Sequence, residues 1–334
     1  MSGAVARAGT GADWAGLLPV DKPAGPTSHD VVARARRALG TRAIGHLGTL
    51  DPGASGLLVL AVGPATRCAS VWQRGRKTYE GTARFGIVTD TQDVHGHVLA
   101  TSAARPEAAA VRAAAAALSG ELLQVPPMVS ALKQGGERLY AIARRGESVL
   151  RAPRPVHVEA WEWLEIGADA ARFRVRCSGG TYVRTLVHDL GSALGCGAAL
   201  ADLRRLVSEP FTLERACGWD DLDVARRDAT LARCGVTLDR ALDVLPSVTL
   251  DDAGCEALGH GRPVVLPAAP GATPGAGGRS LPAGASGAGE RSIVLRNSVG
   301  RALALGELRA DAAGSLQALP QVVFPWAVRQ GPRA

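Results

Sequence analysis

The residues best placed to do chemistry lie in a glycine-rich stretch, residues 45–56, which reads Gly-His-Leu-Gly-Thr-Leu-Asp-Pro-Gly-Ala-Ser-Gly. Asp51 precedes Pro52, which favours extended backbone geometry at the aspartate, and a hydrophobic run, residues 57–62, follows. Turn residues beside a buried strand hold one reactive side chain at a protein surface. A lone Asp-Pro-Gly is usually a tight turn whose Asp bonds its own backbone, but His46, five residues earlier, favours a reactive site.

Three common kinds of site do not fit this stretch. It contains no Gly-x-x-x-x-Gly-Lys-Ser/Thr, the loop that binds nucleotide phosphates. Residues 53–56, Gly-Ala-Ser-Gly, lack the residue that a Gly-x-Ser-x-Gly nucleophile elbow has between its serine and its second glycine. Asp51 and His46 alone supply too few ligands for a metal ion. A single exposed aspartate with a histidine nearby remains.

The rest of the chain predicts the elements that must hold this stretch. Strands are expected at residues 17–20, 56–62 and 78–85, and helices at 28–39, 64–73, 107–118, 138–145 and 181–194. The helix at 28–39 is expected to be capped by Ser28 and stopped by Gly40. A further strand places Phe173, Val175 and Cys177 on one face and Arg172, Arg174 and Arg176 on the other. Strands mixed with helices, without regular βαβ alternation, indicate an α+β fold.

Composition divides the chain into regions. Residues 1–14 are expected to form a flexible tail, and residues 15–247 a large domain. From residue 267 to about 290 the sequence consists largely of Gly, Ala, Pro and Ser, which predicts a flexible segment. It interrupts a small domain, residues 248–330, whose remaining parts are expected to be short strands at 263–266, 292–308 and 321–326.

Bulk properties favour a polyanionic partner. The 334 residues, 46% of them hydrophobic, suffice for one large domain and one small one. The net charge of +7 suits nucleic acid, because Lys and Arg gain affinity by releasing counterions from phosphates. Six scattered cysteines without a Cys-x-x-Cys pattern predict reduced thiols. We find neither a signal peptide nor an apolar run long enough for a bilayer, so a cytoplasmic protein is expected.

Several further motifs follow one another along the chain in a fixed order. They are Val20-Asp21-Lys22-Pro23, Thr27-Ser28-His29-Asp30-Val31-Val32, Lys77-Thr78-Tyr79 with Gly86, Thr89-Asp90-Thr91-Gln92-Asp93, Pro126-Pro127, Ser130-Ala131-Leu132-Lys133 with Gly136, Leu139-Tyr140, Ala143-Arg144 with Gly146, residues 177–186 (Cys-Ser-Gly-Gly-Thr-Tyr-Val-Arg-Thr-Leu), Asp189-Leu190-Gly191 and Leu203-Arg204-Arg205. Together with Gly45-His46 and Gly48-Thr49-Leu50-Asp51-Pro52, they span roughly residues 16–215. This set closely resembles the TruB family of tRNA pseudouridine synthases, and the combination is far more specific than any one motif.

The resemblance implies a fold and a reaction. The fold is the pseudouridine synthase fold, α+β, with a mixed, largely antiparallel central sheet and a catalytic cleft across it. A small β-rich, PUA-like C-terminal domain and an RNA-facing insertion at about residues 124–154 are also implied. The reaction breaks the N1–C1′ bond of a uridine, turns the base and rejoins it through C5. It requires neither a cofactor nor a metal in principle, and we expect none.

The resemblance also implies roles for individual side chains. Asp51 is the expected catalytic carboxylate, and Arg184 is expected to pair with it and keep it charged and oriented. A phosphate contact or a purely structural ion pair is the alternative for Arg184. Tyr79 is expected to stack on the target base and assist proton removal at C5, while Tyr182 and Leu203 line the base pocket. Whether Asp51 attacks C1′, attacks C6 or abstracts a sugar proton stays open.

Two more residues are candidates for contact with the substrate. His46 resembles the residue that the family inserts into the RNA loop to fill the gap left by the flipped-out base. Its other role, general base for Asp51, is less favoured, because a carboxylate is already ionised at neutral pH. Lys22 either supports the motif loop or binds a phosphate. His95 and His97 are expected to lie in a polar turn between strands rather than to bind a metal.

The expected function is conversion of the T-loop uridine, position 55 in tRNA numbering, to pseudouridine. The expected partner is the tRNA T stem-loop, with no membrane, no protein partner and a monomeric chain; a tRNA-folding chaperone role could coexist. One alternative is a catalytically inactive RNA-binding relative, against which intact Asp51, Tyr79 and Arg184 argue. The other is a hydrolase that uses Ser178 or Ser55, against which the missing nucleophile elbow argues.

Overall fold

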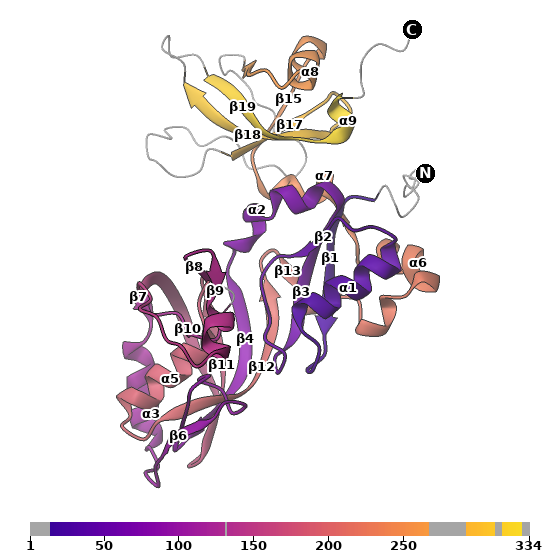
Figure 1. Cartoon of the computed structure of the whole chain (residues 1–334). Coiled ribbons are helices and arrows are strands. Elements are labelled where there is room, and N and C mark those ends of the chain that lie inside the picture. The colour runs from indigo at the N-terminus through magenta and orange to yellow at the C-terminus, as the bar shows by residue number, and fades with distance from the viewer. Residues whose placement is uncertain (1–13, 131, 267–291, 311–315, 329–334) are drawn as a thin grey trace.

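A computed structural model describes residues 14–130, 132–266, 292–310 and 316–328 (Figure 1). The expected flexible segment at 267–290 lies outside the described residues, as does nearly all of the expected tail at 1–14. None of the helices in the described ranges has the length and apolar character that crossing a bilayer requires.

The larger of the two main sheets is mixed and mostly antiparallel, as predicted. Its strands are β1 (Gly16–Lys22), β2 (Ile44–His46), β3 (Ser55–Val62), β4 (Lys77–Phe85), β7 (Gly120–Gln124), β10 (Arg154–Ile166), β11 (Ala170–Cys177), β12 (Ala198–Ser208), β13 (Phe211–Thr212) and β14 (Val236–Thr237). Their order is β14-β1-β3-β12-β4-β11-β10-β7, with β2 on β3 and β13 on β12. β12 and β3 run parallel, whereas the neighbouring pairs around them are antiparallel. β12 therefore joins the two halves of the sheet.

Helices lie at both ends of this large sheet (Figure 1). They are α1 (Ser28–Leu39), α2 (Ser70–Gln73), α3 (Ala108–Ala117), α4 (Leu139–Arg144), α5 (Val183–Ala193), α6 (Arg227–Cys234) and α7 (Leu238–Ala241), with 3₁₀ turns η1 (Gly63–Cys68), η2 (Leu213–Arg215), η3 (Trp219–Asp221), η4 (Val224–Arg226) and η5 (Leu242–Val244). The predicted helix at 64–73 is instead η1 followed by α2. Two small hairpins complete this part, β5 (Ile87–Thr89) with β6 (Val98–Thr101) and β8 (Lys133–Gln134) with β9 (Glu137–Arg138).

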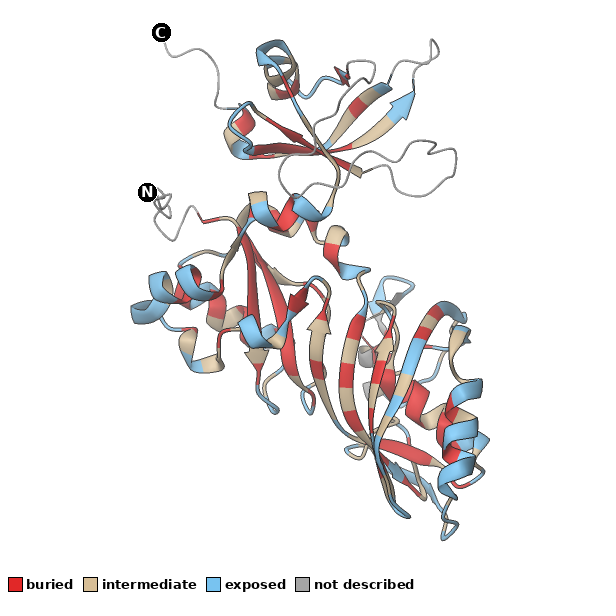
Figure 2. Ribbon diagram, turned by 180° about the vertical axis from the view of Figure 1, so that it is seen from behind, coloured by how far each residue is buried: buried red, intermediate tan, exposed pale blue. Residues whose placement is uncertain are grey.

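The sheet beyond β12 has one buried and one polar face. On β11, Phe173, Val175 and Cys177 are buried, as the alternation predicted. On the opposite face the Arg174 guanidinium lies 2.5 Å from a Glu80 carboxylate oxygen and 3.0 Å from one of Glu162. Figure 2 shows the alternation as bands of red and lighter colour along these strands. Opposite charges on neighbouring strands thus leave this face balanced rather than strongly basic.

The start of α1 differs from the prediction in a way that matters for the site. The cap is Thr27, not Ser28: the Thr27 hydroxyl accepts a hydrogen bond from the Asp30 backbone N–H, and Asp30 accepts one from the Thr27 backbone. Ser28 is buried and exchanges two 2.9 Å hydrogen bonds with the backbone of Leu50. Ser28 therefore ties α1 to the residue that precedes Asp51. The helix does end at Gly40, whose φ of 66° lies in the left-handed region that favours glycine.

A second sheet forms a separate β-rich C-terminal domain. It contains β15 (Ser247–Thr249), β17 (Ser292–Arg296), β18 (Ala302–Ala310), β19 (Leu316–Val323) and β16 (Val264–Val265), in that order, with α8 (Asp252–Gly259) and α9 (Pro325–Val328) beside it. The strand predicted at 321–326 is wrong at its end, because the chain turns at Phe324 into α9. Leu17, Leu57 and Trp72 pack in one core cluster with Val294 and Phe324. The two domains therefore share apolar packing.

Candidate active site

Hydrogen bonds to backbone carbonyl groups hold the loop that carries Asp51. The Gly25 amide donates to the Pro52 carbonyl at 2.8 Å, and the Ala54 amide donates to the Asp51 carbonyl at 3.1 Å. Lys22 Nζ donates to the carbonyls of Pro23 and Pro26 and, at 3.3 Å, to that of Pro52. These bonds involve the carbonyls of Asp51 and Pro52 and the amide of Ala54. The Asp51 side chain itself stays 43% exposed.

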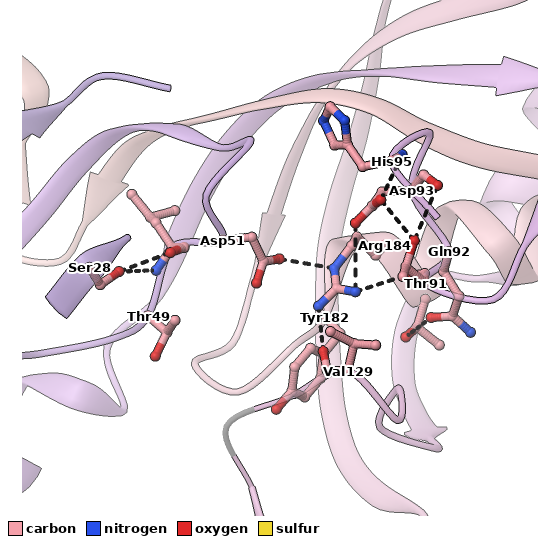
Figure 3. Close-up of polar contacts among 12 residues, drawn as sticks. Ser28, Thr49, Asp51, Thr91, Gln92, Asp93, His95, Val129, Tyr182 and Arg184 are labelled. Carbon is pink, nitrogen blue, oxygen red and sulfur yellow. Dashed lines mark hydrogen bonds and ion pairs between the residues drawn. The ribbon is translucent and has the colours of Figure 1, made fainter. Parts of the chain in front are cut away.

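Arg184, from α5, meets this carboxylate in the expected ion pair. Its Nε lies 2.9 Å from Asp51 Oδ2, and its side chain is only 4% exposed. Nη1 donates to the Thr91 carbonyl at 2.7 Å and Nη2 to the Val129 carbonyl at 2.8 Å (Figure 3). A planar guanidinium with a partner on each nitrogen has one orientation. It therefore presents a positive charge in a fixed position to the Asp51 carboxylate.

A third charged residue, Asp93, belongs to the same network, and the sequence analysis did not identify it as a site residue. Its Oδ2 lies 3.8 Å from Arg184 Nη1. Its Oδ1 accepts hydrogen bonds from the Thr91 hydroxyl at 2.8 Å and from the His95 amide at 3.0 Å. The carboxylate is thus held by its own turn, and only its second oxygen faces Arg184. The signal available in the sequence was an aspartate flanked by residues that form Asx turns.

Asp51 and Arg184 line a cavity of about 400 Å³. Its lining residues are Leu47, Gly48, Thr49, Leu50, Asp51, Gln73, Arg74, Lys77, Tyr79, Ser130, Gly179, Gly180, Thr181, Tyr182, Val183, Arg184, Leu203 and Arg205. Five of the predicted site residues therefore meet here from four separate parts of the chain. His46 is not among the described residues that line this cavity; its ring lies edge-on to His29, with centroids 5.5 Å apart.

The two tyrosines of the cavity come from different elements. Tyr79, on β4, is 8% exposed, and Tyr182 precedes α5. Burial raises the pKa of both phenols, so both are neutral at physiological pH. Gln124 anchors Tyr182: its side-chain carbonyl accepts from the Tyr182 amide at 2.8 Å, and its NH₂ donates to the Tyr182 carbonyl at 3.1 Å. The end of β7 is thereby tied to the start of α5.

Arg205 belongs to the Leu203-Arg204-Arg205 motif, but the sequence did not predict its role, which is structural. It is 3% exposed and lies on β12. Its Nε donates to the Leu57 carbonyl at 2.6 Å, and its Nη2 donates to the Gly48 carbonyl at 3.1 Å. Its guanidinium carbon lies 6.0 Å from the centre of the Tyr79 ring. Arg205 therefore connects the motif loop, β3 and Tyr79 through one buried group.

Two buried lysines support the site. Lys22 is fully buried, with its ammonium on three carbonyls, so it supports the loop; in this conformation it cannot reach a phosphate. Lys77 is 4% exposed and donates to the carbonyls of Gln73 and Gly75 at 2.6 and 2.5 Å. Burial lowers the pKa of each ammonium to about 8. Both lysines therefore stabilise the local backbone through these hydrogen bonds, and burying each ammonium costs free energy of desolvation.

Comparison with known proteins accounts for this arrangement. Residues 36–183 match the TruB family pseudouridylate synthase N-terminal domain, and residues 184–243 match the tRNA pseudouridylate synthase B C-terminal domain. A tRNA pseudouridine synthase B of Burkholderia mallei is 46% identical over 251 residues, 75% of this chain and 83% of that protein. The protein of the same description from Opitutus terrae is 48% identical over 209 residues, 62% of this chain and 87% of that protein.

The chain belongs to the TruB family.

Solved structures of more distant proteins agree with the fold of this TruB-family chain. The archaeal box H/ACA sRNP Nop10–Cbf5 complex contains a chain that superimposes with a TM-score of 0.67 at 26% identity, covering 96% of this chain and 88% of that one. A Cbf5–Nop10–Gar1 complex gives a TM-score of 0.63 at 29% identity, covering 87% and 78%. The pseudouridine synthase fold predicted from the sequence is confirmed.

The hydrolase alternative finds no support in the geometry of this TruB-family chain. The Ser178 hydroxyl accepts a hydrogen bond from the His157 backbone amide at 2.9 Å, and the Ser55 hydroxyl accepts one from Arg204 at 3.3 Å. Both hydroxyls thus have structural partners. His95 and His97 lie in the turn between β5 and β6, as predicted. Among the residues that the structure describes, no group of three or more His, Cys, Asp or Glu side chains is arranged to hold a metal ion.

Proposed function

We propose that this protein is a tRNA pseudouridine synthase that isomerises the T-loop uridine at position 55. The observation that carries the proposal is the half-exposed Asp51 carboxylate, held by the buried Arg184 in the wall of a cavity, in a chain of the TruB family. The names of the curated relatives support tRNA as the substrate. The net charge of +7 agrees with a polyanionic substrate.

In the proposed reaction Asp51 is the reacting group. Its carboxylate attacks C1′ of the ribose or C6 of the base, or takes a sugar proton, so that the N1–C1′ bond breaks while the uracil stays in the cavity. The base turns, a C5–C1′ bond forms, C5 loses its proton and N1 gains one. No atom is added or lost overall, so the reaction needs neither an oxidant nor a cofactor. Arg184 holds the Asp51 carboxylate in one orientation throughout.

The remaining residues of the cavity hold the base. Tyr79, which lines the cavity, is proposed to form the platform for the uracil ring and to take part in proton transfer at C5. Tyr182 and Leu203 line the cavity beside it. His46 lies on β2, which pairs with β3. It is proposed to fill the gap that the flipped-out base leaves in the RNA. Lys22 acts on the motif loop rather than on the RNA.

The C-terminal region from about residue 248 is proposed to be a PUA-like domain that adds RNA contacts to those of the catalytic domain, residues 15–247. The insertion at 124–154, between β7 and β10, is proposed to face the RNA, because its first residue holds Tyr182 at the cavity. A monomer acting on the tRNA T stem-loop in the cytoplasm, without a protein partner, completes the proposal.

The test is to incubate unmodified tRNA with the purified protein alone and to map pseudouridine at every uridine. Pseudouridine at position 55, with release of tritium from C5-labelled uridine, is expected. An inactive RNA-binding relative would bind the tRNA and release no tritium, and pseudouridine only at other positions would remove the T-loop assignment. Asp51→Asn protein serves as the control for contaminating activity.

A further inference from the structure

One residue beside the Arg184 network has an unusual backbone conformation. Gln92 has a φ of 65°, in the left-handed region, and within the described part of the chain it is the only residue other than glycine with a positive φ. A Cβ disfavours this conformation, so it persists only where its surroundings hold it. Gln92 is not among the described residues that line the first cavity or an adjoining one of about 590 Å³, although its neighbours Thr91 and Asp93 line the latter.

Hydrogen bonds fix the backbone of this turn on β12. The Gln92 amide donates to the Thr89 carbonyl at 3.3 Å, and the Gln92 carbonyl accepts from the Leu200 amide at 3.0 Å. The Val94 amide donates to the Leu200 carbonyl at 3.0 Å. The Thr89 hydroxyl donates to the Asp93 carbonyl at 2.6 Å. The turn is thus bonded both within itself and to the central sheet.

The Gln92 side chain ties the same turn to α5. Thr185, which is 3% exposed, donates its hydroxyl to Gln92 Oε1 at 2.7 Å. The preceding residue, Thr91, accepts the 2.7 Å hydrogen bond from Arg184 Nη1. Two successive residues of the turn therefore bond two successive residues of the helix. Figure 3 shows Thr91, Gln92 and Asp93 together beside Arg184.

The geometry of the peptide links the Gln92 side chain to the Thr91 carbonyl. The angle φ of Gln92 is the rotation about its N–Cα bond, and the Thr91 carbonyl belongs to the planar peptide group on the N side of that bond. A change of φ would therefore turn the Thr91 carbonyl relative to the Gln92 side chain. With the side chain held by Thr185 and the carbonyl bonded to Arg184, φ stays at its strained value.

We propose that Gln92 is a positioning residue for the reaction. Its hydrogen bond with Thr185 keeps the turn in the left-handed conformation, and the Thr91 carbonyl then holds the Arg184 guanidinium in the plane that orients Asp51. This inference rests on the proposed function, because Gln92 acts through the Asp51–Arg184 pair. Loss of the bond should slow the chemical step and leave RNA binding nearly unchanged.

The experiment removes the hydrogen bond from either side. Gln92→Met keeps the length of the side chain without the acceptor, and Thr185→Val keeps the shape without the hydroxyl. Each should lower the single-turnover rate on tRNA about tenfold, with tRNA affinity within about twofold of wild type. The double variant should lose no more than either single variant, because both remove the same bond. Thr185→Ser keeps the hydroxyl and should stay within about twofold of the wild-type rate.

Three controls separate positioning from a general loss of stability. Thr230, on α6, is also 3% exposed and donates its hydroxyl to the Asp221 carbonyl at 3.0 Å. Thr230→Val therefore removes a comparable bond and should keep the rate within about twofold. Gln92→Gly relieves the backbone strain, so it should be at least as stable to urea as Gln92→Met but equally slow. In an Arg184→Lys background, Gln92→Met should change the rate by less than about twofold.

Exchange of the Arg184 Nε proton with water gives a readout that needs no turnover. Its NMR signal is identified by its loss in Arg184→Lys, and it should exchange faster in Gln92→Met and Thr185→Val than in the wild type. Unchanged exchange in both variants overturns the inference. So does an equal loss of rate in Thr230→Val, or a full effect of Gln92→Met in the Arg184→Lys background. Failure of the proposed function appears separately, as absence of pseudouridine in tRNA with the wild type.

Discussion

Two buried arginines, one in the catalytic cleft and one at the contact between the domains, have nearly the same bonding pattern. Arg184 bonds two carbonyls and the Asp51 carboxylate at 2.9 Å. Arg296 bonds the carbonyls of Gly300 and Asp239 and the Asp243 carboxylate at 2.8 Å. Asp51 is 43% exposed and Asp243 is 50% exposed. The ion pair alone therefore does not distinguish a reactive site from a structural clamp.

The surroundings make the difference. Asp51 lines two cavities and stands next to two tyrosines and Leu203. Arg296 lies beside the apolar cluster in which Leu57 and Trp72 of the catalytic domain meet Val294 and Phe324. An open cavity next to a held carboxylate admits a substrate, whereas an apolar contact next to one only stabilises the fold. Mutations at the two arginines and their partners should therefore have different effects on turnover and on stability.

The largest effect is expected for Asp51→Asn. The amide has the shape of the carboxylate but is not a nucleophile or a base, so turnover should fall by at least about 1,000-fold while tRNA affinity stays within a few-fold. Tritium release and a binding titration measure the two quantities. Asp243→Asn makes the same chemical change at the other arginine and should leave kcat within about twofold. Near-normal turnover by Asp51→Asn would remove Asp51 from the mechanism.

Arg184→Lys should lower kcat by about 100-fold. A lysine keeps the charge but is a single point donor, so it cannot bond Asp51, Thr91 and Val129 in a fixed plane. Single-turnover kinetics on tRNA measures the chemical step. Arg204→Lys is the matched control, since Arg204 pairs with Asp21 at 2.8 Å but is 41% exposed. Equal losses in the two variants would mean that the orientation of Arg184 has no special role.

Arg296→Met should act on stability instead of turnover. Removing a largely buried charged group breaks the bonds to Asp239, Asp243 and Gly300, and the free energy of unfolding should fall by about 2 kcal/mol. The activity of the folded protein should stay within about twofold. Urea unfolding and tritium release test the two parts. Arg309→Met, at an arginine that is 61% exposed and paired with Glu307, should shift the unfolding midpoint little.

Lys77→Met should change the pH dependence of stability. The pKa of Lys77 is about 8 in the folded protein and near its ordinary 10.5 when unfolded. Between these values the unfolded chain binds more protons, so the wild type should gain stability relative to the variant as pH rises. Below pH 8 both states are protonated and the full penalty applies. From pH 7 to 9.5 the difference should move toward the wild type by on the order of 2 kcal/mol. Parallel curves would contradict a buried ammonium.

The smallest effect is expected from chelation. Because Asp51 is the proposed reacting group and the proposed reaction is an isomerisation, EDTA should leave kcat unchanged on a short RNA stem-loop that folds without magnesium. A loss of activity restored by one specific divalent ion, with the fold of the RNA unaltered, would show that a metal takes part.

Much of the fold around Asp51 could be predicted because its signals are local. The apolar run of β3, Gly40 at the end of α1 and the alternation on β11 each depend on neighbouring residues, and the structure confirms all three. The predicted Arg184–Asp51 pair came from the order of the family motifs, and it is present. The strand β12 was not predicted, because its bulges and the charged residues Asp202, Arg204 and Arg205 break the alternation.

The sequence by itself determined which residue types lie in the motif loop and which face of each strand is apolar, because side-chain periodicity and turn geometry follow from adjacent residues. Only the tertiary structure decided which groups meet across the chain. Arg184 donates hydrogen bonds to the carbonyls of Thr91 and Val129, and Ser28 hydrogen-bonds the backbone of Leu50. The two domains share one apolar cluster. These contacts depend on strand register and domain packing, which are set by the whole fold and leave no pattern in a short stretch of sequence.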